Sequence, residues 1–197
     1  NVLVFLYELS LSPAGLDRLT RTWGLIPAVL MSRPAETWIT IFTSMFLHGG
    51  WFHILSNMWV LFIFGDNVED RMGGARYLVF YLLSGVAAAL MQGFVLPASH
   101  VPTIGASGAI AGVLGAYLIL YPRAKVASLV PILFIFTIIE LPAFLFLLFW
   151  FVSQLFSGWL ALQGAAGSGV AWWAHVGGFV FGMATVGLFS RRQPYYS

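Results

Sequence analysis

Residues 104–121, IGASGAIAGVLGAYLILY, decide the fold of this 197-residue chain. The stretch carries no charged residue and is closed by Pro122-Arg123. A run of this length and composition is typical of a helix that crosses the hydrocarbon core of a bilayer. Gly108 and Gly112 lie four residues apart, which leaves one helix face small enough for another transmembrane backbone to approach closely. The stretch therefore predicts a membrane-spanning helix that packs tightly against a neighbour.

The composition extends this interpretation to the whole chain. Hydrophobic residues make up 60% of the sequence and charged residues 8%, whereas a soluble domain carries about 25% charged residues. Further apolar runs predict spans at residues 51–64 (extended by 42–47), 77–95, from about 141, and 170–189. We therefore predict an all-α polytopic membrane protein with six helices, in a single domain that covers residues 1–197.

The N-terminal part of the sequence predicts an incomplete first helix and an interfacial loop. The run at residues 2–7 meets Glu8 too early to cross a bilayer, so we expect part of this helix to lie upstream of Asn1. Residues 12–43 mix arginines with Trp23 and Trp38, a composition suited to the level of the lipid headgroups. Residues 126–158 are longer than one span requires and contain Pro131, so a strand or half-turn is expected before the fifth helix.

Basic residues between the runs predict the orientation. Two arginines follow the second helix, Arg123 and Lys125 follow the fourth, and Arg191-Arg192 follow the last, while the loops after the third and fifth have none. By the positive-inside rule, the segments that follow the second, fourth and last helices are therefore predicted to face the cytoplasm. The three arginines after the first helix oppose this count, but they lie in a long segment where the rule is weaker.

Four polar residues are predicted at one depth near the outer face. The second, fourth and sixth helices run in the same direction, so their first turns share a leaflet. These turns carry His53 and Asn57, Ser107, and His175, each within about 10 Å of the outer boundary. Polar side chains in apolar helices usually face a bundle interior or a wet cavity. The sequence therefore predicts a polar site between the three helices.

The residue types at this depth suit acyl transfer. A serine hydroxyl is a weak nucleophile until a base removes its proton, and His175 is the only histidine after His100. No acidic residue is predicted at the same depth, so we expect a Ser107–His175 dyad. The free N–H groups at the start of the fourth helix, with His53 and Asn57, could stabilise an oxyanion. Gly178 and Gly182, also four apart, would bring the sixth helix close to the fourth.

These motifs resemble those of the rhomboid intramembrane serine proteases. The resemblance, which covers about residues 43–182, rests on Gly105-Ala106-Ser107-Gly108, on Ala174-His175 with Gly178 and Gly182, on His48 with His53 and Asn57, and on Glu69-Asp70-Arg71-Met72-Gly73.

The resemblance implies a six-helix core with a Ser107–His175 dyad that opens to the outer face of a prokaryotic inner membrane. His53, Asn57 and the Ser107 amide would form the oxyanion site. Structural support would come from the glycines Gly105, Gly108, Gly178 and Gly182, from His48 in the first loop, and from Glu69 and Arg71 after the second helix. The implied substrates are membrane-spanning proteins.

Two positions depart from the family pattern. Residues 38–40 read Trp-Ile-Thr, where many relatives carry Trp-Arg, and Ala111 stands where some relatives have a tyrosine that stacks on the catalytic histidine. We therefore expect another group, Trp172 or Trp173, to orient His175.

Other classes of protein are less consistent with the sequence. A transporter or channel would show matched broken helices or an inverted repeat, and neither is found. A catalytically silent rhomboid-like protein that binds membrane clients would usually lack the serine or the histidine. His48 and His53 have no carboxylate or His-Glu-x-x-His pattern beside them, so neither a metal nor another cofactor is expected. No basic cluster indicates nucleic acid, and the oligomeric state stays open.

Overall fold

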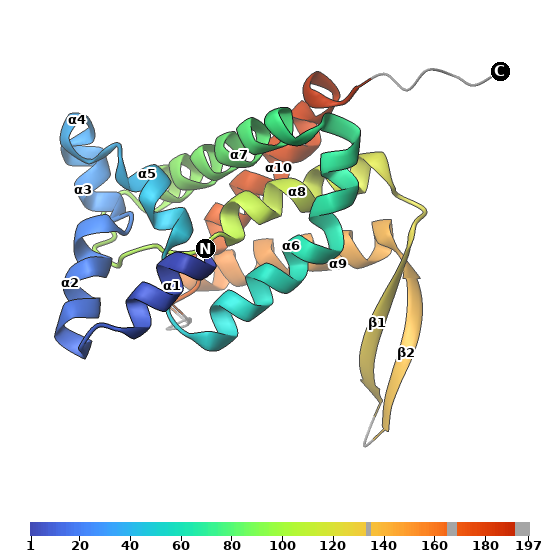
Figure 1. Cartoon of the computed structure of the whole chain (residues 1–197), viewed down its shortest axis with the longest axis horizontal. Helices are drawn as coiled ribbons and strands as arrows, with labels where there is room; N and C mark the ends of the chain where they lie inside the picture. The colour runs from blue at the N-terminus through green and yellow to red at the C-terminus, as the bar shows by residue number, and fades with distance from the viewer. Residues whose placement is uncertain (133–134, 165–168, 192–197) are drawn as a thin grey trace.

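The structure is a computed structural model that describes residues 1–132, 135–164 and 169–191. Its helices and strands follow in chain order (Figure 1): α1 Val2–Leu9, α2 Pro13–Trp23, α3 Pro27–Ser32, α4 Pro34–Thr37, α5 Thr40–Thr43, the 3-10 turn η1 Ser44–Phe46, α6 Trp51–Met72, α7 Gly74–Val95, α8 Ser107–Leu120, β1 Lys125–Ile132, β2 Ile135–Pro142, α9 Ala143–Leu162 and α10 Trp172–Phe189.

The long helices have the character of membrane spans. In the described residues, α7, α9 and α10 are each long and apolar enough to cross a bilayer, and α5–η1 joins α6 as a bent pair that would make a fourth span. Large apolar side chains such as Phe52, Phe94 and Leu188 are exposed on the outside of the bundle, where a bilayer would place lipid against them. The predicted all-α membrane bundle is confirmed, while the count of six spans stays a prediction.

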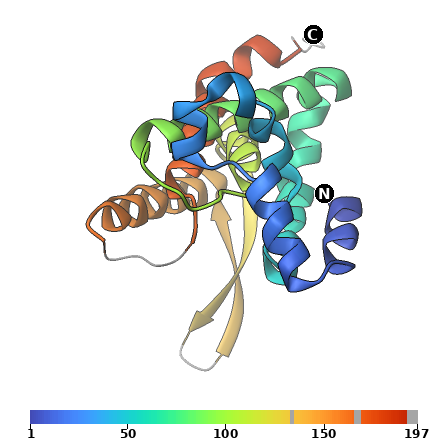
Figure 2. The ribbon, with the colours of Figure 1, turned by 90° about the vertical axis from the view of Figure 1, so that its left-hand side faces the viewer.

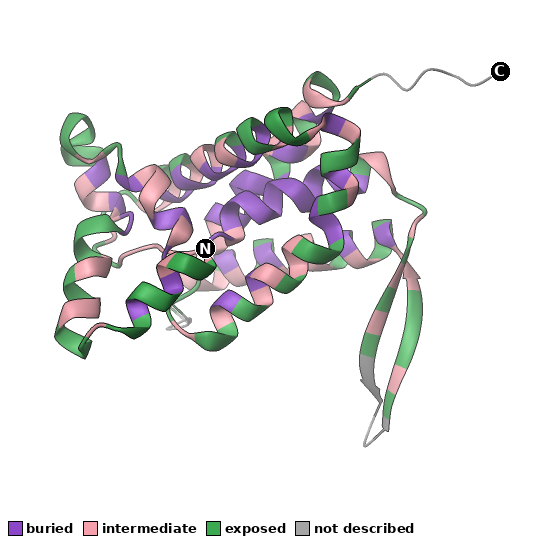
Figure 3. Cartoon of the chain, viewed as in Figure 1, coloured by how far each residue is buried: buried purple, intermediate pink, exposed green. Residues whose placement is uncertain are grey.

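The helix α8 lies at the centre of the bundle. It has only 14 residues, and the side chains from Gly108 to Leu118 are all buried, as Figure 3 shows. Its glycines face neighbouring backbones: a Cβ added at Gly115 would collide with the carbonyl oxygen of Phe179 in α10, and one at Gly112 with Ser84 in α7. The sequence stretch quoted first is thus the element around which the other helices pack.

Two of the helix boundaries that differ from the predicted ones have a clear physical reason. The helix α6 continues through Gly65 to Met72, because one glycine costs a helix only about 1 kcal/mol and its missing side chain lets Tyr77 of α7 approach. The helix α8 begins at Ser107 and not at Ile104, because Thr103 pairs with Leu25 of the first loop and Gly105 N–H donates to Ser44 O.

The first loop forms a small layer at one end of the bundle. Figure 2 faces this end and shows the short helices α2 to α5, in blue, in front of the longer helices. The layer is attached by Leu25, which is buried and exchanges backbone hydrogen bonds with Thr103, and by the Thr43 hydroxyl, which donates to Trp23 O at 2.7 Å. The segment predicted as interfacial therefore supports the residues that lead into Ser107.

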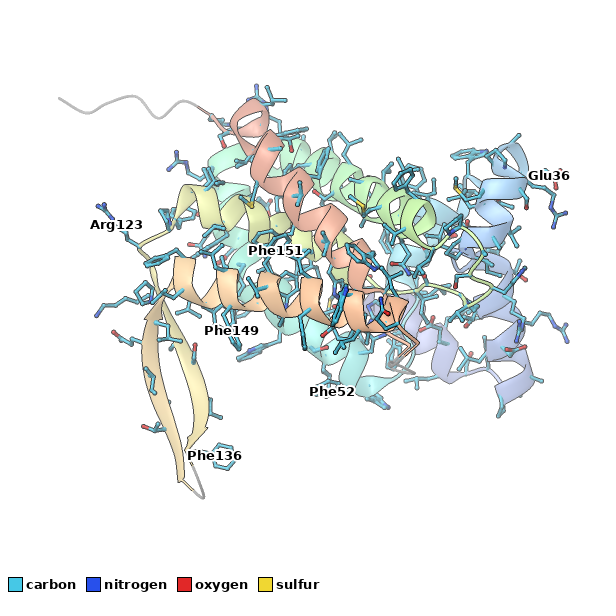
Figure 4. All side chains as sticks on the ribbon, turned by 180° about the vertical axis from the view of Figure 1, so that it is seen from behind. Glu36, Phe52, Arg123, Phe136, Phe149 and Phe151 are labelled. Carbon is cyan, nitrogen blue, oxygen red and sulfur yellow. The ribbon has the colours of Figure 1, made fainter. Side chains whose placement is uncertain are left out.

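An antiparallel hairpin, β1–β2, connects α8 to α9 and extends away from the helices (Figure 1). An ion pair between Lys125 and Glu140 at 2.7 Å closes its base. Leu129, Phe136 and Ile138 are exposed, and Phe136 points away from the bundle in Figure 4. The sequence predicted a strand or half-turn here. Pro131 fits in β1 because both strands are edge strands, where a missing N–H is tolerated.

Candidate active site

Ser107 and His175 lie within hydrogen-bonding distance of each other. Ser107 is the first residue of α8 and His175 lies in the first turn of α10, and Ser107 Oγ is 2.8 Å from His175 Nε2. The imidazole is buried, with 9% of its surface exposed. A hydroxyl that donates to an imidazole nitrogen at this distance has the geometry of a nucleophile beside its base.

Glycines at the α8–α10 crossing allow this approach. A Cβ added at Gly178 would collide with the carbonyl oxygen of Gly108, and one at Gly182 with that of Gly112. On its other side, Gly108 packs against α7, where an added Cβ would be 2.7 Å from Ala88 Cβ. The two glycine pairs predicted to support the site therefore meet each other at the helix crossing that carries Ser107 and His175.

The second ring nitrogen of His175 contacts a residue that sequence reasoning missed. Gln154 of α9 is buried, and its Oε1 lies 2.8 Å from His175 Nδ1. Gln154 and its neighbour Ser153 are the polar residues in the middle of α9, where the other side chains are apolar or aromatic. That isolation within a membrane helix is the signal that could have identified it.

Aromatic residues surround the imidazole but do not stack directly on it. The Trp150 ring is 5.9 Å from the His175 ring at 33°, and the Trp172 ring is 6.2 Å away, edge-on at 89°. Trp173 packs instead against Gly158 of α9. Of the two tryptophans expected to orient His175, Trp172 therefore contributes only an edge contact, and the hydrogen bond comes from Gln154.

His53 and Asn57 lie beside the residues that lead into Ser107. Gly105 has a φ of +120°, and a Cβ added there would be 2.6 Å from His53 Nε2 and 3.7 Å from Asn57 Nδ2. His53 Nδ1 accepts from Gly49 N–H at 3.3 Å, which leaves Nε2 as the protonated, donating nitrogen. Within the described part of the chain, the buried Asn57 Nδ2 finds no hydrogen-bond partner.

These side chains line one cavity of about 610 Å³, shared by His53, Asn57, Ser107, Trp150 and His175. The first amides of a helix have no intrahelical acceptor, so the N–H groups at the start of α8 are further donors beside Ser107. The cavity thus combines a nucleophile, a base and several N–H donors. Among the residues the structure describes, no cluster of three or more His, Asp or Glu side chains could hold a metal.

His48 lies at the junction of α1, η1 and α6. Its backbone N–H donates to the buried carboxylate of Glu8 at 3.1 Å, and its Nδ1 lies 3.1 Å from Phe46 O. The His48 ring packs edge-to-face against His53 at 5.1 Å. His48 therefore connects the N-terminal helix to the residue beside Gly105.

Glu69 and Arg71 lie far from this cavity, in the last turn of α6. Glu69 O accepts from Gly73 N–H at 2.6 Å, and Arg71 O accepts from Arg191 N–H at 2.7 Å. The Arg71 guanidinium lies 6.0 Å from the centre of the Tyr121 ring. Both residues, predicted in a loop after the helix, instead lie in the last turn of α6, and Arg71 joins this turn to the ends of α8 and α10.

Several known proteins are similar to this chain in sequence. The chloroplastic rhomboid-like protein 11 of Arabidopsis thaliana is 41% identical over 75 residues, which cover 38% of this chain and 26% of that protein. The mitochondrial presenilin-associated rhomboid-like protein of Homo sapiens is 30% identical over 158 residues, 77% of this chain and 39% of that protein. The inactive RHOMBOID-like protein 8 of Arabidopsis thaliana is 34% identical over 116 residues, 56% of this chain and 32% of that protein.

This chain therefore spans less than half the length of these relatives. The family model of the rhomboid domain matches residues 35–192, which include the five cavity residues named above. Together with the helical membrane bundle, this match over most of the sequence shows that the chain belongs to the rhomboid family.

Proposed function

We propose that this protein is an intramembrane serine endopeptidase that hydrolyses peptide bonds in or near the transmembrane segments of membrane proteins. The observation that carries the proposal is the 2.8 Å contact between Ser107 Oγ and His175 Nε2 in a cavity inside a membrane bundle. Most rhomboid proteins are serine proteases of this kind, which supports the same conclusion.

The reaction would follow the chemistry of other serine hydrolases. Ser107 Oγ attacks the carbonyl carbon of the substrate while its proton moves to His175 Nε2, which then donates it to the departing amine. A water molecule, activated by the same nitrogen, releases the acyl group and restores Ser107.

The charge that develops on the carbonyl oxygen requires hydrogen-bond donors. The donors proposed are the backbone N–H of Ser107, His53 Nε2–H and Asn57 Nδ2–H. Asn57 Nδ2 supports this role, because it is buried and has no partner in the described part of the chain, so it is available to an oxygen that enters the cavity.

The basic residues support an orientation in which the cavity opens to the outer face of a prokaryotic inner membrane. Arg71, Arg123 and Arg191 follow or end α6, α8 and α10, whereas His53, Ser107 and His175 lie in the first turns of the same helices. The positive-inside rule assigns the arginine end to the cytoplasm. Proteins whose transmembrane helices approach from the outer leaflet are the proposed substrates.

Similarity to a relative named as inactive favours one second candidate, a silent protein that binds membrane clients without cleaving them. A fluorophosphonate, which reacts with activated serines, distinguishes the two. The purified protein in lipid is expected to be labelled, Ser107→Ala is expected to lose all labelling, and His175→Ala is expected to lose both labelling and cleavage of a model transmembrane substrate.

Ser56 offers the matched control. It lines the same cavity, but its hydroxyl donates to His53 O of its own helix at 3.0 Å, so Ser56→Ala should be labelled like the wild type. Equal labelling of wild type and Ser107→Ala would refute the protease proposal and leave the client-binding role.

A further inference from the structure

We infer that Gln154 is a positioning residue that fixes the tautomer of His175, so that the site works as a Ser107–His175–Gln154 triad. This inference rests on the proposed function. It starts from the two hydrogen-bond partners of the His175 ring among the described residues, Ser107 on Nε2 and Gln154 on Nδ1. Within the described ranges, the partner of Nδ1 is an amide oxygen and not a carboxylate.

The orientation of the Gln154 amide follows from its own neighbours. Its Nε2 lies 3.2 Å from Trp150 O and 2.9 Å from Ser153 Oγ, and the Ser153 hydroxyl itself donates to Trp150 O at 2.6 Å. Both neighbours therefore offer lone pairs to the amide nitrogen. A flipped amide would set Oε1 against the Trp150 carbonyl oxygen, where neither atom could donate.

This orientation determines where His175 carries its proton. With Nε2 of Gln154 directed at Trp150 and Ser153, Oε1 is the atom that faces His175 Nδ1, and it can only accept. The Nδ1 atom must therefore be protonated. In the neutral ring Nε2 is then the lone-pair nitrogen, which is the form that accepts the Ser107 proton.

The opposite tautomer would be inactive, because a protonated Nε2 cannot act as a base toward Ser107. In water the imidazole exchanges between the two forms, and Ala111, which is fully buried and has no ring, cannot hold it. Gln154 supplies the constraint instead. It also stabilises the imidazolium that forms during attack, because Oε1 accepts from Nδ1–H in both charge states.

The packing of α9 holds Gln154 at this distance. The Phe151 ring stacks on Phe179 of α10 at 4.6 Å, and Trp150 packs on the same ring at 5.8 Å. Figure 4 shows Phe151 on the side of α9 toward the bundle and Phe149 on the opposite side. The glutamine is thus placed by an aromatic contact between the two helices that carry the hydrogen bond.

The test replaces Gln154 and reads the tautomer directly. In ¹⁵N-histidine-labelled protein in lipid, the His175 signals are identified as those lost in His175→Ala. The wild type is expected to show a pyrrole-type Nδ1 and a pyridine-type Nε2. In Gln154→Leu, which has similar volume but no acceptor, the proton should distribute over both nitrogens, and fluorophosphonate labelling should slow by about tenfold or more.

Two further variants separate positioning from a general structural role. Gln154→Glu keeps an acceptor oxygen at the same length in either protonation state, so it should retain the Nδ1–H form and restore most of the labelling rate. Gln92→Leu removes another buried glutamine, whose Oε1 accepts from Ala174 N–H at 3.2 Å and does not bond to the ring. The tautomer should be unchanged in this variant.

The outcomes distinguish the two proposals. In one outcome, Ser107→Ala loses the labelling seen in the wild type, while Gln154→Leu keeps the wild-type tautomer and labelling rate. This outcome would overturn the role of Gln154 and leave the protease proposal intact. If Gln154→Leu does not fold, a Gln154→Glu protein that has lost the Nδ1–H form would overturn the role equally. Absence of Ser107-dependent labelling in the wild type would instead refute the proposed function.

Discussion

Two residues of the cavity region, Asn57 and Gly105, have local structures that suit the proposed reaction but lower the stability of the fold. A buried N–H donor without an acceptor costs a fold about 1–3 kcal/mol, and Asn57 Nδ2 has no acceptor among the residues that the structure describes. Gly105 has a positive φ that residues with a Cβ rarely adopt, and it admits His53 at close range. Unfavourable features of this kind concentrate at functional sites.

Asn57→Ala is expected to lower kcat for a model transmembrane substrate by about 10²–10³-fold, the usual effect of removing one oxyanion donor. Activity should not vanish, because His53 and the Ser107 amide remain. The thermal unfolding midpoint should not fall, since the variant removes an unpartnered donor. Asn67→Ala, on the same helix but bonded to Asp66 and Ile63, is the control. A wild-type rate in Asn57→Ala would contradict the oxyanion role.

At the scale of elements, the distance between Ser107 and His175 depends on how closely α8 and α10 approach. Gly112 and Gly182 form the next level of this crossing, where an added Cβ on Gly182 would collide with the Gly112 carbonyl oxygen. A carbonyl oxygen belongs to the backbone and cannot move aside like a side chain. Any side chain at this level must therefore separate the two helices.

Gly182→Ala is expected to destabilise the bundle by about 1–3 kcal/mol and to slow labelling of Ser107. Gly187→Ala, five residues further along α10, is the matched control, because an added Cβ there meets nothing within 4 Å. The two proteins are compared by thermal unfolding and by the rate of fluorophosphonate labelling. Equal values for the two variants would show that the close crossing does not set the geometry of the pair.

At the scale of the whole molecule, the apolar runs predicted most of the long helices, because a membrane segment needs uninterrupted hydrophobicity that a sequence displays directly. The boundaries at Met72 and Ser107 were not predicted, since they depend on contacts with Tyr77 and Leu25. The contact of Ser107 with His175 followed from common depth and glycine spacing. The contact of Gln154 with His175 did not, because no glycine spacing or motif in α9 indicates which side of that helix packs against His175.

The helix α1 is connected through Glu8 to His48, which precedes α6. Glu8→Ala removes the acceptor of His48 N–H and is expected to cost about 1–3 kcal/mol of stability. It should also slow labelling of Ser107, because His48 packs on His53. Glu36→Ala is the control. Glu36 is exposed and pairs with Arg33 at 3.6 Å, and Figure 4 shows it at the outer edge. Unchanged unfolding in Glu8→Ala would rule out this connection.

The shortness of α8 has a consequence for the lipid around the protein. Its 14 residues rise about 21 Å, whereas the hydrocarbon core of a typical bilayer is about 30 Å thick. With its C-terminal end at one boundary, α8 leaves the Ser107 hydroxyl about 9 Å below the other. Lipids with longer acyl chains would increase the depth of the Ser107 hydroxyl below the boundary, and lipids with shorter chains would reduce it. The supply of water for deacylation would therefore vary with lipid chain length, without any change in the protein.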